Sequence, residues 1–302
     1  MTHLEIFHGL VAAGMNMRYG RELDKETTLR LLWEKKQIMD AGFVDYYILA
    51  FTIFNLHRPE DTDIVAYGMC NSSIVCYCLG LTEVDPVKYG LQSVRFVNEK
   101  PPKFQFDVAS SRYDEFMKNA EEILQAHAED YNIQAIRECL FQQVLPFSCL
   151  DRKREREVPD NIDDEVARYA LKVPHTMDLY DTYVRRSNGE AWQATGFAAL
   201  DEILAPTFGL LVYQEQMLDI LRQLFHMRSL DANRLRVTIH RKFTCGETES
   251  LEAAKKDLFS DLKGLTPEEA ETAWNALLSN SHPYLKAHAV SRVLASYHYE
   301  MQ

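Results

Sequence analysis

The 302-residue sequence has no apolar run long enough to span a bilayer, and residues 1–5 do not form a secretory n-region. It also lacks a C-x-x-C pair, since its six cysteines stand at positions 70, 76, 78, 139, 149 and 245. A zinc or dithiol redox site is therefore not expected. We expect reduced thiols, a cytoplasmic location and no membrane partner.

An excess of basic residues is missing as well. The chain has 33 Lys and Arg against 45 Asp and Glu, a net charge of −12. A protein that grips a duplex usually clusters Lys and Arg to displace counterions, so DNA binding here requires local basic patches. With 46% hydrophobic and 26% charged residues, the composition is that of an ordinary globular chain of one or two domains.

The central stretch, residues 65–107, begins with a turn rich in small residues. This turn, residues 66–73, precedes an apolar run at 74–81 that is typical of a buried helix. Small residues let a backbone approach a phosphate, and the N–H groups at a helix start face an anion. Gly68, Ser72 and Ser73 are therefore candidate nucleotide or phosphate contacts. Alternatively, the serines satisfy nearby backbone groups.

A Pro-marked loop follows, and then a short strand that carries one acidic residue, Asp107. In two-metal phosphoryl transfer, carboxylates hold a pair of divalent ions. Asp107 is therefore the candidate metal ligand and catalytic residue of this stretch. One carboxylate is an incomplete set for two ions.

These residues resemble the palm of bacterial replicative DNA polymerase, the C-family alpha subunit of polymerase III. The family pattern is roughly G-R-G-S-x-x-x-S-L-V-A-Y-x-L-x-I-T-x-x-D-P, followed by E-R-F-L-N-P-E and P-D-I-D-x-D-F. The matching residues are Gly68, Ser73, Val75, Tyr77, Leu79, Thr82, Asp85, Pro86, Arg95, Phe96 and Asn98. The resemblance implies a nucleotidyltransferase palm in which a D-x-D pair and a third, later aspartate bind Mg²⁺.

The sequence departs from this pattern at the residues that would carry catalysis. The family's Gly-Ser pair reads Gly68-Met69, and its D-x-D reads Gln105-Phe106-Asp107. Between residues 147 and 182 the chain lacks the segment that carries the family's third aspartate. We therefore interpret Asp107 as a catalytic relic and expect Mg²⁺ only if some activity remains.

The second half resembles the fingers of the same family. Residues 204–217 resemble L-x-x-T-Y-G-x-x-V-Y-Q-E-Q-V, and residues 286–289 and 294–297 resemble parts of K-S-H-x-A-A-Y-A-x-x-S-Y. In the family these helices lie over the incoming nucleotide. Lys286 and His288 are therefore candidate nucleic-acid contacts, or residues of a helix surface. Within the segment that reads Y-Q-E-Q, residues Tyr213, Gln214 and Glu215 are expected to hold the fingers together by packing and hydrogen bonds.

A basic segment in this half is similar to the family's L-R-R-A-M-G-K-K, which faces the nucleotide's phosphates. Its cations here include Arg236, Arg241 and Lys242, which are candidate phosphate contacts. A solvated helix end is the alternative interpretation.

Apolar spacing predicts helices at 4–20, 25–41, 110–128 and 133–144. In the second of these we place Leu32, Ile38 and Met39 on the inner side. Thr266-Pro267-Glu268-Glu269 is a capping box that predicts a helix to about residue 278. The charge run at 151–157 indicates a solvated linker or helix face.

The predicted fold is α+β: a palm-like region with a small mixed sheet (1–150), a linker with a shortened palm remnant (151–199), and a mainly helical fingers-like region (200–302). The first function hypothesis is a truncated, catalytically inactive polymerase relative that still binds primed DNA or nucleotide. The alternative is a non-enzymatic interaction protein that binds or competes for replication proteins. A minimal active DNA polymerase is the third.

Overall fold

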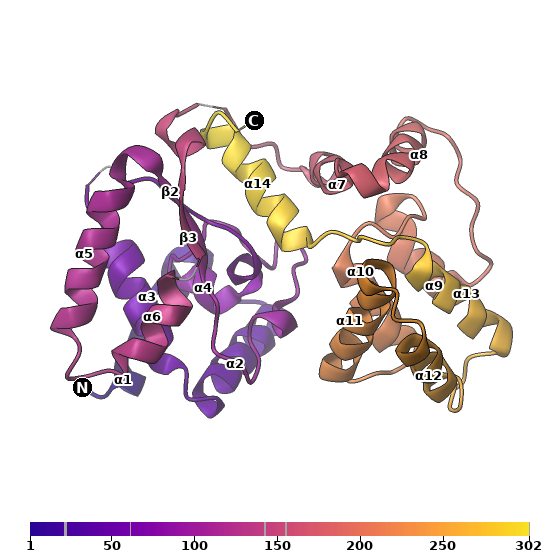
Figure 1. The fold of residues 1–302 in the computed structure, drawn as a ribbon, viewed down its shortest axis with the longest axis horizontal. Helices are drawn as coiled ribbons and strands as arrows, with labels where there is room; N and C mark the ends of the chain where they lie inside the picture. Colours follow the sequence, from indigo (N-terminus) through magenta and orange to yellow (C-terminus); the bar gives the residue numbers. More distant parts are fainter. Residues whose placement is uncertain (21–22, 61, 142, 155, 302) are drawn as a thin grey trace. The chain divides into compact units, whose positions relative to one another are not determined.

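The computed structural model describes residues 1–20, 23–60, 62–141, 143–154 and 156–301. The chain divides into two compact units, Met1–Pro159 with Val290–Gln302, and Asp160–Ala289 (Figure 1). Helices dominate, and a small mixed sheet is present, so the predicted α+β class is confirmed. No helix in the described part of the chain is long and apolar enough to cross a membrane. The predicted boundaries of the three regions, after residues 150 and 199, stay predictions.

The first unit contains the sheet and the helices around it. Its helices are α1 (His3–Tyr19), α2 (Lys25–Asp40), α3 (Val44–Phe51), α4 (Ile74–Cys78), α5 (Tyr113–Ala126), α6 (Ile133–Phe141) and the part of α14 (Lys286–His298) from Val290 onward. Its strands are β1 (Ile64–Ala66), β2 (Gln105–Ala109) and β3 (Gln143–Phe147). The turn, helix, loop and strand predicted for residues 65–107 therefore occur in that order.

The central strand β2 pairs antiparallel with β1 and parallel with β3. Because side chains alternate along a strand, Phe106 and Asp107 point to opposite faces of the sheet. The Phe106 ring stacks on Phe54, with ring centroids 3.9 Å apart, and Phe54 packs against Phe116 of α5. One face of the sheet is thus part of the apolar core. Asp107 is on the other face.

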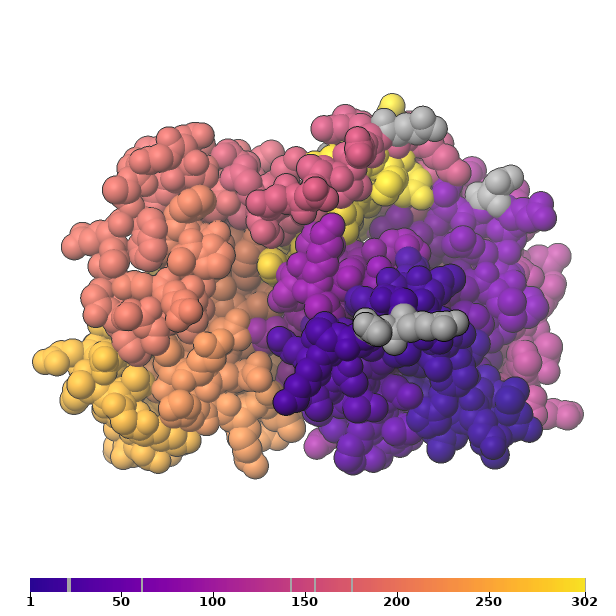
Figure 2. Space-filling view, turned by 180° about the vertical axis from the view of Figure 1, so that it is seen from behind, coloured from indigo at the N-terminus to yellow at the C-terminus, as the bar shows by residue number. Residues whose placement is uncertain are grey.

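Helix α1 confirms the helix predicted at 4–20, and its Thr2–Glu5 capping box fixes its start. It lies with α2 on the surface drawn in indigo in Figure 2. Gly14 on α1 lies directly against α4, since a Cβ atom built there would fall 1.7 Å from the carbonyl oxygen of Cys78. A glycine is therefore required for α1 and α4 to approach this closely.

Two helix predictions need correction. In α2 the buried face carries Leu31, Glu34 and Ile38, while Leu32 is 56% exposed. Ile38 is buried as predicted and Met39 packs partly buried against the core, so only Leu32 is misplaced, and Leu31 takes the inner position in its stead. The helix predicted at 133–144 ends at Phe141, and Gln143–Phe147 form β3. Pro146 cannot continue a helix, and residues 143–147 instead pair in parallel with β2.

The second unit is helical. It contains α7 (Asp163–Leu171), α8 (Met177–Ser187), α9 (Ala198–Leu204), α10 (Gln214–Asp219), α11 (Ser229–Cys245), α12 (Glu249–Leu258), α13 (Pro267–Leu278) and the first residues of α14. Its core includes Leu200, Ile220, Leu221, Trp274 and Leu277. Helix α13 begins with the predicted capping box, in which Glu269 N–H donates to Thr266 Oγ1 at 3.2 Å.

Candidate functional site

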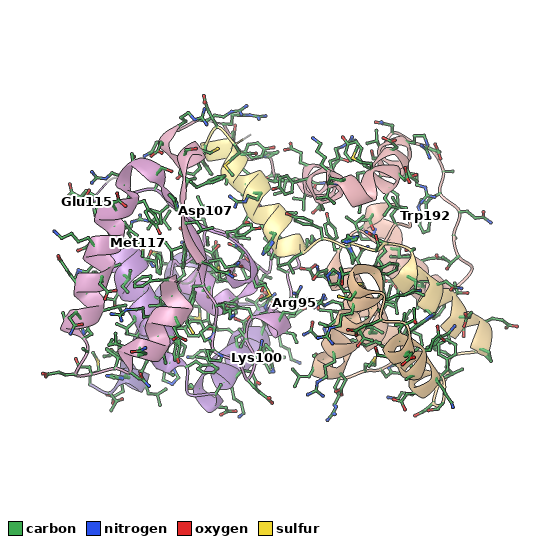
Figure 3. The ribbon with its side chains drawn as sticks, viewed as in Figure 1. Arg95, Lys100, Asp107, Glu115, Met117 and Trp192 are labelled. Carbon is green, nitrogen blue, oxygen red and sulfur yellow. The ribbon has the colours of Figure 1, made fainter. Side chains whose placement is uncertain are left out.

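The predicted metal ligand, Asp107, lies on β2 (Figure 3). Its side chain is buried and paired with a cation from α14. Arg292 Nη1 lies 2.5 Å from Asp107 Oδ2. Two aromatic rings hold the guanidinium, whose carbon lies 4.2 Å from the ring centroid of Tyr67 and 4.8 Å from that of Phe147. Asp107 therefore sits in an aromatic-lined ion pair within the first unit.

The electrostatics of this pair do not suit a divalent cation. Burial raises the pKa of Asp107, and the neighbouring Arg292 only partly opposes that rise. Mg²⁺ prefers several oxygen ligands, whereas Asp107 faces a guanidinium. Within the described ranges, no group of three His, Cys, Asp or Glu side chains is placed to hold a metal ion. The residues around Asp107 thus do not fit the two-metal site that the family pattern implies.

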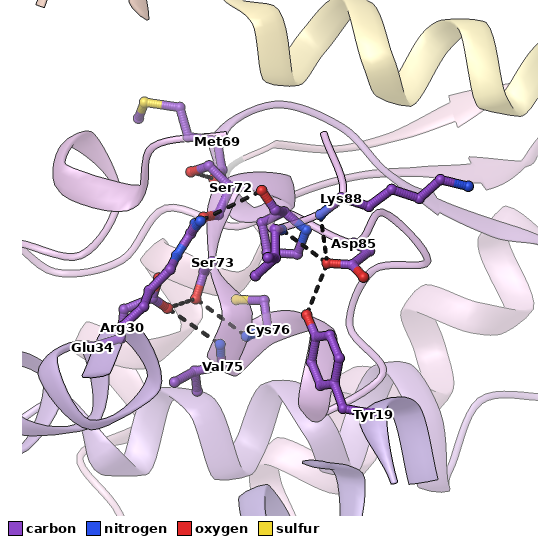
Figure 4. A network of polar contacts seen from close by, with 12 residues as sticks. Tyr19, Arg30, Glu34, Met69, Ser72, Ser73, Val75, Cys76, Asp85 and Lys88 are labelled. Atoms are coloured by element: carbon purple, nitrogen blue, oxygen red, sulfur yellow. Dashed lines mark hydrogen bonds and ion pairs between the residues drawn. The ribbon is translucent and has the colours of Figure 1, made fainter. Parts of the chain in front are cut away.

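The small-residue turn is buried, and its hydroxyl groups bond within the first unit (Figure 4). Gly68 adopts φ 88°, a conformation that glycine tolerates best. Ser72 Oγ donates to the carbonyl of Met69 at 2.6 Å. Ser73 Oγ donates to Glu34 at 2.7 Å and accepts the N–H of Cys76 at 3.2 Å. These contacts favour the structural interpretation of the serines; phosphate contact by Gly68, Ser72 and Ser73 stays a prediction.

Glu34 of α2 occupies the anion position at the start of α4. It is fully buried, and its Oε2 accepts the hydroxyl of Ser73 and, at 3.2 Å, the N–H of Val75. Arg30 Nε lies 3.3 Å from Glu34, and Arg30 Nη2 donates to the carbonyl of Ser72 at 2.6 Å. A carboxylate of the protein therefore caps the helix where a bound phosphate would place its charge. Sequence reasoning missed Glu34, since nothing distinguished it from other charged residues of α2.

The predicted cations of α11 fall into two environments. Arg236 is 8% exposed, and its Nε donates to Asn233 at 3.0 Å. Arg241 is well exposed, with its nearest carboxylate, Glu247, 3.9 Å away. Lys242 lies with its ammonium 5.5 Å from the ring centroid of Phe243. Arg236 is thus largely buried, whereas Arg241 and Lys242 lie closer to solvent, and phosphate contact by the three stays a prediction.

Side chains of the segment at 213–216 hold the second unit together, and Gln216, which the sequence did not single out, contributes beside the predicted Gln214. Gln216 Oε1 accepts the N–H groups of Val212 and Tyr213 at 2.8 and 2.9 Å, and Gln216 Nε2 donates to Thr207 at 2.7 Å. Gln214 Nε2 donates to the carbonyl of Pro283 at 2.9 Å. Side chains from α10 therefore hydrogen-bond both to the segment before this helix, at 207–213, and to the loop that contains Pro283.

The two predicted nucleic-acid contacts lie on the first turn of α14. The backbone N–H of Lys286 donates to both carboxylate oxygens of Glu215, at 3.1 and 3.0 Å. The ammonium of Lys286 lies 5.7 Å from the ring centroid of Tyr213, and His288 packs edge-on against Tyr284. Both side chains are half-buried. Their contact with nucleic acid stays a prediction.

A mixed sheet followed by a helical unit of this kind is what the palm and fingers motifs indicated, and two family models match accordingly. The model described as bacterial DNA polymerase III alpha NTPase domain matches residues 5–145. The model described as bacterial DNA polymerase III alpha subunit finger domain matches residues 153–264. The two units of the chain are therefore similar, in order, to the NTPase and finger domains of the bacterial DNA polymerase III alpha subunit.

Similar curated proteins are error-prone DNA polymerases. The one from Bdellovibrio bacteriovorus is 30% identical over 135 residues, which cover 44% of this chain and 12% of that protein. The one from Corynebacterium diphtheriae is 32% identical over 120 residues, which cover 38% of this chain and 11% of that protein. The one from Anaeromyxobacter sp. (strain K) is 27% identical over 121 residues, which cover 39% of this chain and 11% of that protein. The match thus spans about a tenth of the length of these relatives.

Proposed function

We propose that this chain is a member of the DNA polymerase III alpha family that binds primed DNA or nucleotide but does not transfer nucleotides. The observation that carries the proposal is the ion pair between Asp107 and Arg292. Two-metal transfer requires carboxylates that neutralise both ions and stabilise the developing charge. Removing such stabilisation typically costs about 3 kcal/mol or more in the transition state. A guanidinium on the one candidate carboxylate repels a second cation as well.

The binding half of the proposal is supported by the exposed cations of α11. Arg234 and Arg241 are seven residues apart, so they lie two turns apart on one face of the helix. Their side chains are 79% and 59% exposed. Each of the two arginines has one carboxylate nearby. Such exposed ion pairs contribute little to stability and are screened by salt. A nucleic-acid phosphate can therefore compete for these cations at low ionic strength.

Binding to a primed duplex across a salt series tests this half. We expect measurable affinity at low salt and a negative slope of log affinity against log salt. The variant with Arg234→Gln, Arg241→Gln and Lys242→Gln should lose affinity and show a slope shallower by about two to three. The control variant, with Lys36→Gln and Lys118→Gln, removes exposed cations of the first unit and should behave as the wild type. Equal losses in both variants would contradict a site on α11.

The interaction-protein alternative is favoured by an apolar face on α2. Leu29, Leu32 and Trp33 are 57, 56 and 39% exposed on successive turns of one helix. If the chain does not bind DNA at low salt, affinity capture from the source cell should compare the wild type with Leu29→Glu, Leu32→Glu. A replication protein retained only by the wild type would support this alternative. Equal capture by both would exclude this face.

A further inference from the structure

The first unit contains a cavity of about 580 Å³ beside the edge strand β1. This volume is in the range of small-molecule sites, about 300–1,000 Å³. The cavity is bounded by β1, by the loops before it and after α4, and by α14 residues that belong to the first unit. Gly68, Ser72, Ser73 and Asp107 are absent from its lining, so the cavity is separate from the polymerase-like candidate site.

Thr62 in the cavity wall carries an unpaired hydroxyl. The residue is 5% exposed, and its Oγ1 has no hydrogen-bond partner in the described part of the chain. An unpaired buried hydroxyl is unfavourable, so its retention needs an explanation. Rotation about χ1 moves the hydroxyl to another staggered position, which lets Oγ1 turn toward a ligand. Thr62 is therefore a hydrogen-bonding group available to an occupant of the cavity.

The charges that line the cavity are unevenly paired. Both carboxylates are engaged: Asp63 accepts the Tyr299 hydroxyl at 3.1 Å and lies 3.2 Å from Lys153, and Arg18 binds both oxygens of Glu83. The cations Arg58 and Lys88, by contrast, form no ion pair within the described residues, although the Lys88 ammonium lies 5.4 Å from the Tyr89 ring centroid. The unpaired charge is therefore positive.

Polar and apolar groups share the lining of the cavity about equally. The rings of Phe54 and Phe106 border the cavity, together with the aliphatic side chains of Leu81, Val84 and Leu294. The apolar part of this surface favours an apolar body, while the unpaired cations favour a negative group. We propose that this cavity binds a small organic anion, whose apolar body packs on these side chains. Its carboxylate or phosphate group pairs with Arg58 or Lys88 and accepts a hydrogen bond from Thr62.

Titration of the whole chain with matched probes tests the ligand class. Benzoate and phenyl phosphate provide an anion on an aromatic body, benzamide and benzyl alcohol provide neutral counterparts, and inorganic phosphate provides the anion alone. Ligand-observed NMR should show binding of at least one aromatic anion at an affinity at least tenfold above its neutral counterpart and above inorganic phosphate. Equal binding of anionic and neutral probes, or no binding of either aromatic anion, would overturn the proposal.

Variants locate the bound probe. The Arg58→Gln, Lys88→Gln variant should bind the aromatic anion at least tenfold more weakly than the wild type. The control variant Lys118→Gln, at an exposed lysine, should bind it with unchanged affinity. The variant with Arg234→Gln, Arg241→Gln and Lys242→Gln should also keep full affinity, which separates this cavity from the proposed DNA contacts. Probe affinity that survives loss of Arg58 and Lys88 would overturn the assignment.

The Thr62→Val substitution distinguishes a ligand-binding hydroxyl from a structural one. Valine keeps the shape and removes the unpaired group, so the unfolding midpoint without ligand should rise while probe affinity falls about tenfold. A lower midpoint with unchanged affinity would show that the hydroxyl serves the fold and would remove it from the site. The double-cation variant provides the test if Thr62→Val does not fold.

Discussion

Arg292 Nη1 lies 2.5 Å from Asp107 Oδ2, so the carboxylate that the family pattern would give to a metal ion is bound by a guanidinium of the same chain. The two side chains are 15% and 6% exposed, and the rings of Tyr67 and Phe147 flank the cation. Burial favours this pairing, because neither charge can be left alone at low cost away from water.

Breaking the pair should therefore destabilise the fold. Arg292→Met and Asp107→Asn should each lower the free energy of unfolding by about 3 kcal/mol, because each leaves one charge buried without a partner. The double variant should lose much less than the sum of the two. Urea unfolding of all four proteins measures the coupling. Additive losses would show that the two residues do not act as a pair.

The sequence predicted helices α1, α2, α5 and α13, the turn, helix and strand of residues 65–107, and a packing role for Gln214 and Glu215, because those features follow from local motifs and periodicity. It did not predict β1 or β3, whose pairing with β2 is not encoded in local spacing. The sequence could not predict the ion pair between Arg292 and Asp107. Arg292 lies outside the matched motif residues, and only the fold brings it to Asp107. Glu34 was missed for a related reason. A charged residue on an amphipathic helix is normally placed on the solvent face, and only its contacts with Ser73 and Val75 reveal that it is buried.

Glu34 is expected to stabilise the first unit strongly. Glu34→Gln keeps the side-chain shape but loses the charge that pairs with Arg30 and caps α4, so the free energy of unfolding should fall by about 2 kcal/mol. The exposed Glu26 of the same helix provides a control, and Glu26→Gln should cost less than about 1 kcal/mol. Urea unfolding compares the two. Equal effects would contradict the role assigned to Glu34.

Two glycines of α1 provide a test of how closely α1 and α4 pack. Gly14→Ala places a Cβ atom against the Cys78 carbonyl and should destabilise the protein by about 1–3 kcal/mol. Gly9→Ala on the same helix meets nothing within 4 Å and should stabilise it by about 0.5–1 kcal/mol. Thermal unfolding of the two variants shows whether each substitution raises or lowers the stability. A stabilising Gly14→Ala would show that the helices are farther apart.

His240 of α11 should make stability depend on pH. Burial, and then the nearby Arg236 and His282, lower its pKa from the ordinary 6.5. The unfolded chain therefore binds a proton at His240 more readily than the folded chain does. The contribution of neutral His240 to the free energy of unfolding is present above about pH 6.5 and is lost as the pH falls through the lowered pKa. His240→Gln should reduce the drop in unfolding midpoint between pH 7.5 and pH 5. An unchanged drop would exclude His240 as a contributor.

Primer extension tests the central claim most directly. The wild type and Asp107→Ala are incubated with a primed template, the four nucleotides and either Mg²⁺ or Mn²⁺, and the products are resolved by length. We predict that the wild type incorporates no more nucleotide than Asp107→Ala, because Arg292 occupies the one candidate carboxylate. Incorporation by the wild type that Asp107→Ala abolishes would contradict the account.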